Sequence, residues 1–154
     1  MGHAALETVS KQKPMRVGKI TFEYYDNYLF IKLPSGRKLS YFNPMLKRNI
    51  YGKESLTYEG IATNKKWQRI ETYGPKLVEN IVQGISRDIL AHAMMNLKRR
   101  NFKIVMHVHD EVVLEVKKNQ VTVEEICEII TIPPPYAEDL CLKAEAYKCD
   151  FYKK

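Results

Sequence analysis

The strongest constraint on the fold is an amphipathic stretch over residues 75–100. Its apolar residues recur every three or four positions, the period of an α-helix: Val78, Val82, Ile85 and Ile89, flanked by Leu77, Ile81, Leu90, Met94 and Leu97. Pro75 suits the first turn of a helix, and basic residues 98–100 suit the negative end of the helix dipole. The pattern predicts a helix about 39 Å long, at 1.5 Å per residue, with burial on more than one side.

The segments before this helix predict mainly strands. Residues 20–42 are rich in β-branched and aromatic side chains, with turn residues at Asp26-Asn27 and at positions 34–36, so we expect three short antiparallel strands. Residues 4–12 suit a short helix. Residues 43–74 show no clear period, so we expect an irregular segment that crosses the surface. It contains the only tryptophan and six basic residues: Trp67, Lys47, Arg48, Lys53, Lys65, Lys66 and Arg69.

After the long helix, the sequence predicts a hairpin and a second helix. Residues 102–108 and 111–116 suit two strands, with the turn at or near His109-Asp110. Thr122 and Glu125 have the spacing of a capping box at the start of a helix, which the prolines at 133–135 end. Residues 140–152 alternate like a final strand. This order predicts an α+β fold in which a long and a shorter helix cover one face of an antiparallel sheet.

Length and composition argue against a membrane-spanning, secreted or disulfide-rich protein. The 154 residues fit one domain or a piece of a larger one, and no apolar run reaches the roughly 20 residues of a membrane helix. The amino terminus lacks the pattern of a secretory signal. Three cysteines without a Cys-x-x-Cys pair argue against a disulfide framework or a cysteine zinc site, and favour the cytoplasm. A net charge of +7 suits contact with phosphates.

A polar cluster interrupts the predicted hairpin: His107, His109, Asp110 and Glu111, within VMHVHDEVVLEV. It can be read as an ordinary polar turn, although adjacent carboxylates repel each other unless a cation compensates. It can also be read as a hydrolase metal site, but the His-x-His-x-Asp-His spacing of metallo-β-lactamase-like enzymes is missing. A third interpretation is a Mg²⁺ site, because Mg²⁺ takes carboxylates together with substrate phosphates. Phosphoryl-transfer enzymes use two such ions roughly 3.5–4 Å apart.

The hairpin and the long helix together resemble a known family. IVMHVHDEVVLEV is similar to motif C in the palm of family A DNA polymerases, and KKWQRIETYGPKLVENIVQGISRDILAHAM resembles the helix before it in the phage and prophage branch. LPSGRKLSY and LKAEAYKCDFYKK also resemble segments of that branch, so the likeness covers roughly residues 16–154. It implies a β-meander, a basic segment and the end of the fingers in residues 1–74, and a palm portion in residues 75–154.

The resemblance implies roles for individual residues. Asp110 matches the aspartate that ligates the catalytic metals, and Glu111 the adjacent supporting acid, so both are the expected catalytic and metal-binding residues. His109 matches a histidine beside the primer terminus, and Gln83 a glutamine at the minor-groove edge. Two further candidate DNA-binding residues are Asn80 and Arg87, whereas His107 is expected to be a packed strand residue.

The chain departs from the family in two motifs. Motif A, with the other metal-binding aspartate, and motif B, with the nucleotide-binding residues of the fingers, find no match here. We therefore expect the C-terminal part of a DNA-directed DNA polymerase that is inactive in isolation. The helix predicted near Met1 favours truncation, as in a cloned fragment, a truncated gene or a subunit of a split enzyme.

The complete enzyme would use a two-ion Mg²⁺ site, primer–template DNA and dNTPs, and the N-terminal half of the polymerase would be a partner. The alternative is a non-catalytic DNA-binding or interaction remnant of a prophage polymerase.

Overall fold

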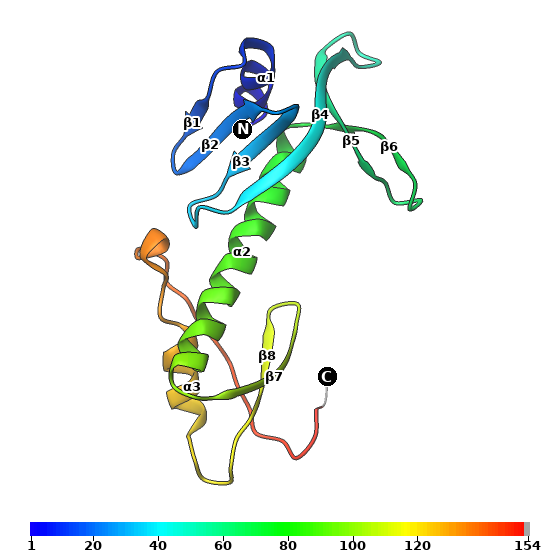
Figure 1. The fold of residues 1–154 in the computed structure, drawn as a ribbon. Coiled ribbons are helices and arrows are strands. Elements are labelled where there is room, and N and C mark those ends of the chain that lie inside the picture. Colours follow the sequence, from blue (N-terminus) through cyan, green and yellow to red (C-terminus); the bar gives the residue numbers. More distant parts are fainter. Residues whose placement is uncertain (153–154) are drawn as a thin grey trace. The chain divides into compact units, whose positions relative to one another are not determined.

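A six-stranded antiparallel sheet occupies most of residues 15–72 in the computed structural model, which describes residues 1–152 (Figure 1). The strands lie in sequence order, each paired with the next: β1 (Met15–Val17), β2 (Ile20–Tyr25), β3 (Tyr28–Lys32), β4 (Lys38–Arg48), β5 (Glu54–Ile61) and β6 (Trp67–Thr72). The helix α1 (Gly2–Lys11) precedes them, and the long helix α2 (Gly74–Arg99) follows. The chain forms two compact units that meet within α2, one ending at Ile85 and the other starting at Ser86.

The predicted meander is confirmed by the pairing of β2, β3 and β4. Tyr25 pairs with Tyr28, so Asp26 and Asn27 form a two-residue turn, and both have positive φ values of 50° and 60°. Positive φ at both central residues is what the tight hairpin turn requires, and Asn and Asp tolerate it better than most residues. The sequence therefore encodes this turn locally.

The prediction of an irregular segment over residues 43–74 is wrong. Strand β4 continues to Arg48, and β5 and β6 follow as a hairpin. A register shift between Phe42 and Met45, where Asn43 has a φ of 47°, explains the missed pattern. A bulge inserts an extra residue and moves the following side chains to the other face, so the alternation that marks a strand changes phase in mid-strand.

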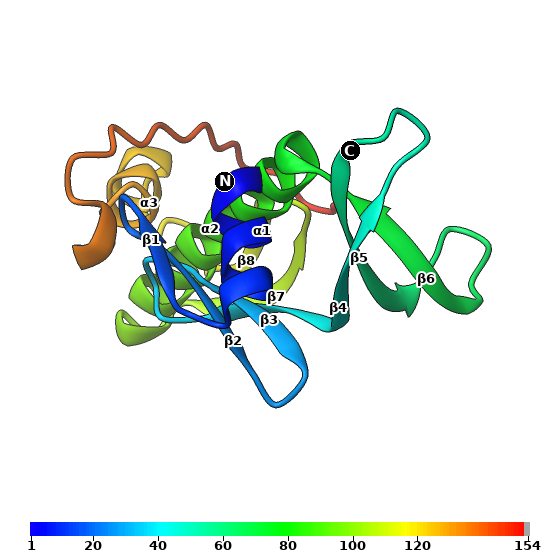
Figure 2. The ribbon, with the colours of Figure 1, turned by 90° about the horizontal axis from the view of Figure 1, so that it is seen from above.

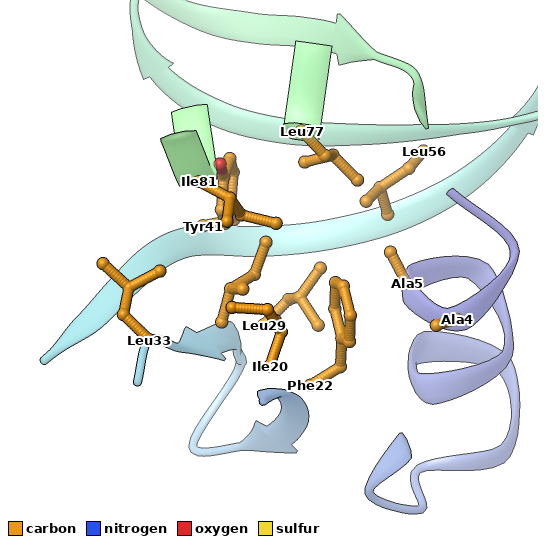
Figure 3. Packing of buried hydrophobic residues seen from close by; sticks show 11 residues of the cluster. Ala4, Ala5, Ile20, Phe22, Leu29, Leu33, Tyr41, Leu56, Leu77 and Ile81 are labelled. Atoms are coloured by element: carbon orange, nitrogen blue, oxygen red, sulfur yellow. The ribbon is translucent and has the colours of Figure 1, made fainter. Parts of the chain in front are cut away.

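The core of the first unit lies on one face of this sheet (Figure 3). Helix α1 contacts strands β1 to β5 (Figure 2), and α2 contributes side chains from its first turns. The buried cluster comprises Ala4, Ala5, Ile20, Phe22, Leu29, Ile31, Leu33, Tyr41, Leu56, Leu77 and Ile81. Both helices therefore protect the same face from water.

A glycine in α2 allows the β3–β4 hairpin to approach the helix closely. A Cβ at Gly84 would lie 2.8 Å from Cδ1 of Leu33, so a larger residue would force this side chain to move. Arg37, in the same hairpin, donates a hydrogen bond from Nη2 to the carbonyl oxygen of Gly84 at 2.7 Å. Close packing and this hydrogen bond thus fix the hairpin on the first half of α2.

The second unit contains the rest of α2 and four short elements: β7 (Lys103–Val108), β8 (Glu111–Glu115), α3 (Val123–Ile130) and a 3-10 turn (Pro135–Ala137). The predicted long helix and the predicted hairpin are confirmed, but β7 and β8 form a sheet of their own, separate from the six-stranded one. The capping box at the start of α3 is also confirmed, since Thr122 Oγ1 accepts from the Glu125 amide and the Glu125 carboxylate accepts from the Thr122 amide.

The predicted final strand over residues 140–152 is wrong. These residues form no strand within the part of the chain that the structure describes. Alternation of polar and apolar residues becomes a strand only where a neighbouring edge supplies hydrogen bonds, and that condition cannot be read from one segment.

Two further observations concern the whole described chain. None of the helices within residues 1–152 is both long and apolar enough to cross a membrane. The three cysteines carry free thiols, with Cys127 half-buried in α3 and Cys141 and Cys149 exposed.

Candidate functional site

The polar cluster lies at the tip of the β7–β8 hairpin. Val108 pairs with Glu111, so His109 and Asp110 are the two residues of the turn. His109, Asp110 and Glu111 are all exposed to solvent. The hairpin folds locally because β-branched residues flank a two-residue turn on both sides, and it presents two adjacent carboxylates at its end.

The backbone at the tip carries strain. His109 has a φ of 52°, in the left-handed region where an L-residue costs roughly 1–2 kcal/mol. Glycine or asparagine would occupy this position more easily. Other turn residues of the chain, such as Lys65 and Asn119, adopt the same left-handed conformation, and at the hairpin tip it sets the path of the backbone into Asp110.

Glu111 has a partner that the sequence did not reveal. The hydroxyl of Tyr152 donates to Oε2 of Glu111 at 3.2 Å, across 41 positions of the sequence. The pKa of Tyr152 is raised, first by desolvation and then by the negative charge and hydrogen bonding of Glu111. The tyrosine therefore stays protonated and remains a donor to the carboxylate. No local sequence pattern links these two residues.

Arg87 and His107 lie beside each other in the second unit. Nη2 of Arg87 is 3.4 Å from Nε2 of His107, and both side chains are exposed. The prediction that His107 is packed is therefore wrong. It alternates with half-buried residues of β7 and falls on the open face of a two-stranded sheet. A guanidinium can only donate, so this contact uses the acceptor form of Nε2.

Asn80 and Gln83 differ in their contacts within the first unit. Asn80 is half-buried and donates from Nδ2 to the hydroxyl of Tyr41 at 3.0 Å. Burial raises the pKa of Tyr41, and the hydrogen bond from Asn80 opposes that rise. Gln83 is exposed, and its Nε2 donates to Oε1 of Glu79, one turn earlier, at 3.3 Å. Asn80 is thus engaged with the sheet, whereas the Gln83 amide faces solvent.

Almost the whole chain is similar in sequence to part of a known protein. The chain is 44% identical over 153 residues to the DNA polymerase of Bacillus phage SP02. It is similar to part of a phage DNA polymerase. The alignment covers 98% of this chain but 24% of that polymerase, so the chain spans about a quarter of its relative's length. No family model matches the chain, and no solved structure matches it.

The carboxylates at the hairpin tip are of the kind that bind metal ions. Asp110 and Glu111 offer hard oxygen ligands of the kind that Mg²⁺ prefers. Within residues 1–152, however, the structure groups no three or more His, Cys, Asp or Glu side chains in a way that could hold a metal ion. By themselves, the two carboxylates would supply only part of the ligand set of a Mg²⁺ ion.

The positive charge is unevenly distributed along the chain. Residues 1–85 contain 14 Lys and Arg against 7 Asp and Glu, whereas residues 86–154 contain 11 of each kind. The whole net charge of +7 therefore belongs to the first unit. A basic surface is the electrostatic feature expected of a protein that contacts nucleic acid.

Proposed function

We propose that the chain is the C-terminal part of a family A DNA polymerase, and that the β7–β8 hairpin is its motif C. The observation that carries the proposal is the presence of two exposed acids, Asp110 and Glu111, at a hairpin tip in a chain 44% identical to part of a phage DNA polymerase. The reaction would be template-dependent nucleotidyl transfer to a primer.

In the complete enzyme, Asp110 and Glu111 would hold part of a two-ion Mg²⁺ site. Ions bound there would activate the attacking oxygen and stabilise the leaving group. Asp110 would be a direct ligand. Glu111 would support it, while its own carboxylate is oriented by the hydroxyl of Tyr152 at 3.2 Å. The turn conformation of His109 would fix the position of the carboxylates at the tip.

Three exposed side chains would contact DNA in this proposal: Gln83, Arg87 and His109. Gln83 has an amide that can donate and accept, which suits the edge of a base pair. Arg87 suits a phosphate. Asn80 is a weaker candidate, because its amide already donates to Tyr41.

The isolated chain would lack turnover, because its residues include neither a motif A aspartate nor the motif B residues of the fingers. The same observation supports a second candidate, a DNA-binding remnant without turnover. The concentration of positive charge in residues 1–85 favours DNA contact in either case. Cytoplasmic localisation is part of both proposals.

The test is a chimera. The matching quarter of the phage SP02 polymerase is replaced by this chain, and template-dependent primer extension is measured. We expect the chimera to extend a primer and the isolated chain to incorporate nothing above background. A folded chimera without activity would favour the non-catalytic candidate. Template-dependent incorporation by the isolated chain would contradict the claim that the chain needs its missing partner.

A further inference from the structure

The face of the six-stranded sheet opposite the core carries a continuous row of aromatic rings. In β3, Tyr28 and Phe30 alternate with the fully buried Leu29 and Ile31, so they point to the other face. Tyr28 pairs with Tyr25 on one side and with Phe42 on the other. We name the five rings on this face the aromatic row: Tyr25, Phe30, Tyr28, Phe42 and Trp67.

Successive rings of the aromatic row are in contact. The ring centroids are 4.5 Å apart for Tyr25 and Phe30, and 5.4 Å apart for Phe30 and Tyr28. The row continues over 5.0 Å to Phe42 and 6.1 Å to Trp67. From β2 to β6 it crosses four steps between strands, or about 19 Å at ~4.8 Å per step. Each ring thus has an aromatic neighbour at the distance typical of stacked or tilted pairs.

The two ends of the row are open to solvent. Trp67 is 59% exposed and Tyr25 is 48% exposed, whereas the three rings between them are half-buried. Aromatic pairs across strands stabilise a sheet by themselves, which accounts for the middle of the row. That role does not require a tryptophan and a tyrosine with about half of their surface in water.

Lysines lie beside the aromatic row, one over two of its rings and others next to its members in sequence. Nζ of Lys38 lies 5.0 Å from the ring centroid of Tyr25 and 5.2 Å from that of Phe30. Lys32 is exposed on β3, and Lys65 and Lys66 are exposed in the turn that leads into Trp67. The face is not purely basic, since Glu23 pairs with Lys38 and Glu59 with Arg69. The unit as a whole nevertheless carries the entire net charge of +7.

We propose that the aromatic row is a stacking surface for single-stranded nucleic acid. Aromatic side chains on an open surface stack on unpaired bases, and nearby cations follow the phosphates. A duplex keeps its bases stacked on each other and offers no free base face, so it would contact the cations alone. A protein partner would use the positive charge near the row only through acidic groups of its own, whereas a nucleic acid supplies both base faces and phosphates. The aromatic row belongs to the first unit and the hairpin tip to the second, and the proposal does not depend on the proposed polymerase chemistry.

The only tryptophan of the chain lies in the row and provides a direct probe. Trp67 fluorescence is titrated with a thymidine oligonucleotide of about 12 residues, within the usual range for single-strand sites, and with an abasic oligonucleotide of equal length and charge. We expect strong quenching by the first and weak quenching by the second at the same salt concentration. Equal quenching by both would overturn the proposal, because binding would then be electrostatic only. This experiment uses the wild-type chain alone.

Variants test the row by affinity, with a labelled oligonucleotide and fluorescence anisotropy. Tyr25→Ala and Trp67→Ala should each weaken binding at least about fivefold, the lower limit for loss of one stacked base. Tyr51→Ala is the matched control, because Tyr51 is 79% exposed in the same unit but outside the row. It should leave the affinity unchanged. Melting followed by circular dichroism confirms that each variant folds.

Three outcomes would overturn the proposal. The first is an equal loss of affinity in Tyr51→Ala and in the row variants. The second is tighter binding of a duplex than of a single strand at equal salt. The third is self-association of the chain, measured by light scattering, that Trp67→Ala abolishes while the oligonucleotide has no effect. The last result would assign the row to a protein contact. None of these results bears on the activity of the chimera.

Discussion

The strained turn at the hairpin tip allows a quantitative prediction for His109→Gly. A φ of 52° costs an L-residue roughly 1–2 kcal/mol. Glycine avoids this cost but loses about 0.5–1 kcal/mol through its greater freedom in the unfolded chain. The expected net effect is a stabilisation of the hairpin by about 0.5–1 kcal/mol. His109→Ala is the matched control, since it removes the imidazole but retains the Cβ and therefore the strain.

The assay must report on the second unit. Trp67 lies in the first unit, so its fluorescence does not report directly on the hairpin. Hydrogen exchange at the amides of β7 and β8 measures local opening. We expect exchange about two- to fivefold slower in His109→Gly than in His109→Ala, as 1.4 kcal/mol corresponds to a factor of ten. Equal or faster exchange in His109→Gly would refute the assignment of strain to this turn.

Three further predictions concern stability, duplex binding and metal binding. Asn80→Ala should lower the free energy of unfolding by about 1 kcal/mol because it removes the hydrogen bond to Tyr41. Gln83 is exposed, so Gln83→Ala should change the free energy of unfolding by less than about 0.5 kcal/mol. Equal losses of stability in urea denaturation would contradict the different roles of these residues. The chain should bind duplex DNA weakly and without sequence preference through its basic residues over 43–76. The affinity should fall about 40-fold between 50 and 200 mM salt if three phosphates are neutralised. An affinity that does not change with salt concentration would exclude phosphate contact. Asp110→Asn should leave the thermal midpoint of the isolated chain almost unchanged or slightly higher, because Asp110 is exposed. Millimolar Mg²⁺ should not raise the wild-type midpoint, because a partial ligand set binds Mg²⁺ weakly. A large Mg²⁺-dependent rise of the midpoint that is lost in the mutant would reveal a complete metal site.

Sequence reasoning succeeded where the structure is encoded locally. The β7–β8 hairpin follows from a two-residue turn between β-branched runs, and the start of α3 follows from Thr122 and Glu125. The turn at Asp26 and Asn27 is likewise determined by its own residues, since both tolerate positive φ. In each case, a few neighbouring residues determine the outcome.

The failures concern structure that depends on distant partners. Strands β5 and β6 lack the alternation that marks a strand, because residues 55–57 of β5 are buried in succession, β6 is partly exposed, and both strands follow the bulge at Asn43. Residues 140–152 alternate like a strand, but no described strand pairs with them. The contact between Tyr152 and Glu111 and the aromatic row both join residues that only the folded chain brings together.

The most direct test of the central claim is the rate of nucleotide incorporation by the chimera in a single turnover. Asp110→Asn is compared with Asp139→Asn, which changes another exposed aspartate outside the hairpin. If Asp110 is a catalytic carboxylate, its replacement should lower the rate by at least about 10²-fold, the usual effect of losing one preorganised electrostatic group, while Asp139→Asn stays within about twofold of the parent chimera. An Asp110→Asn chimera that incorporates nucleotides as fast as the Asp139→Asn control would contradict the assignment of motif C to this hairpin.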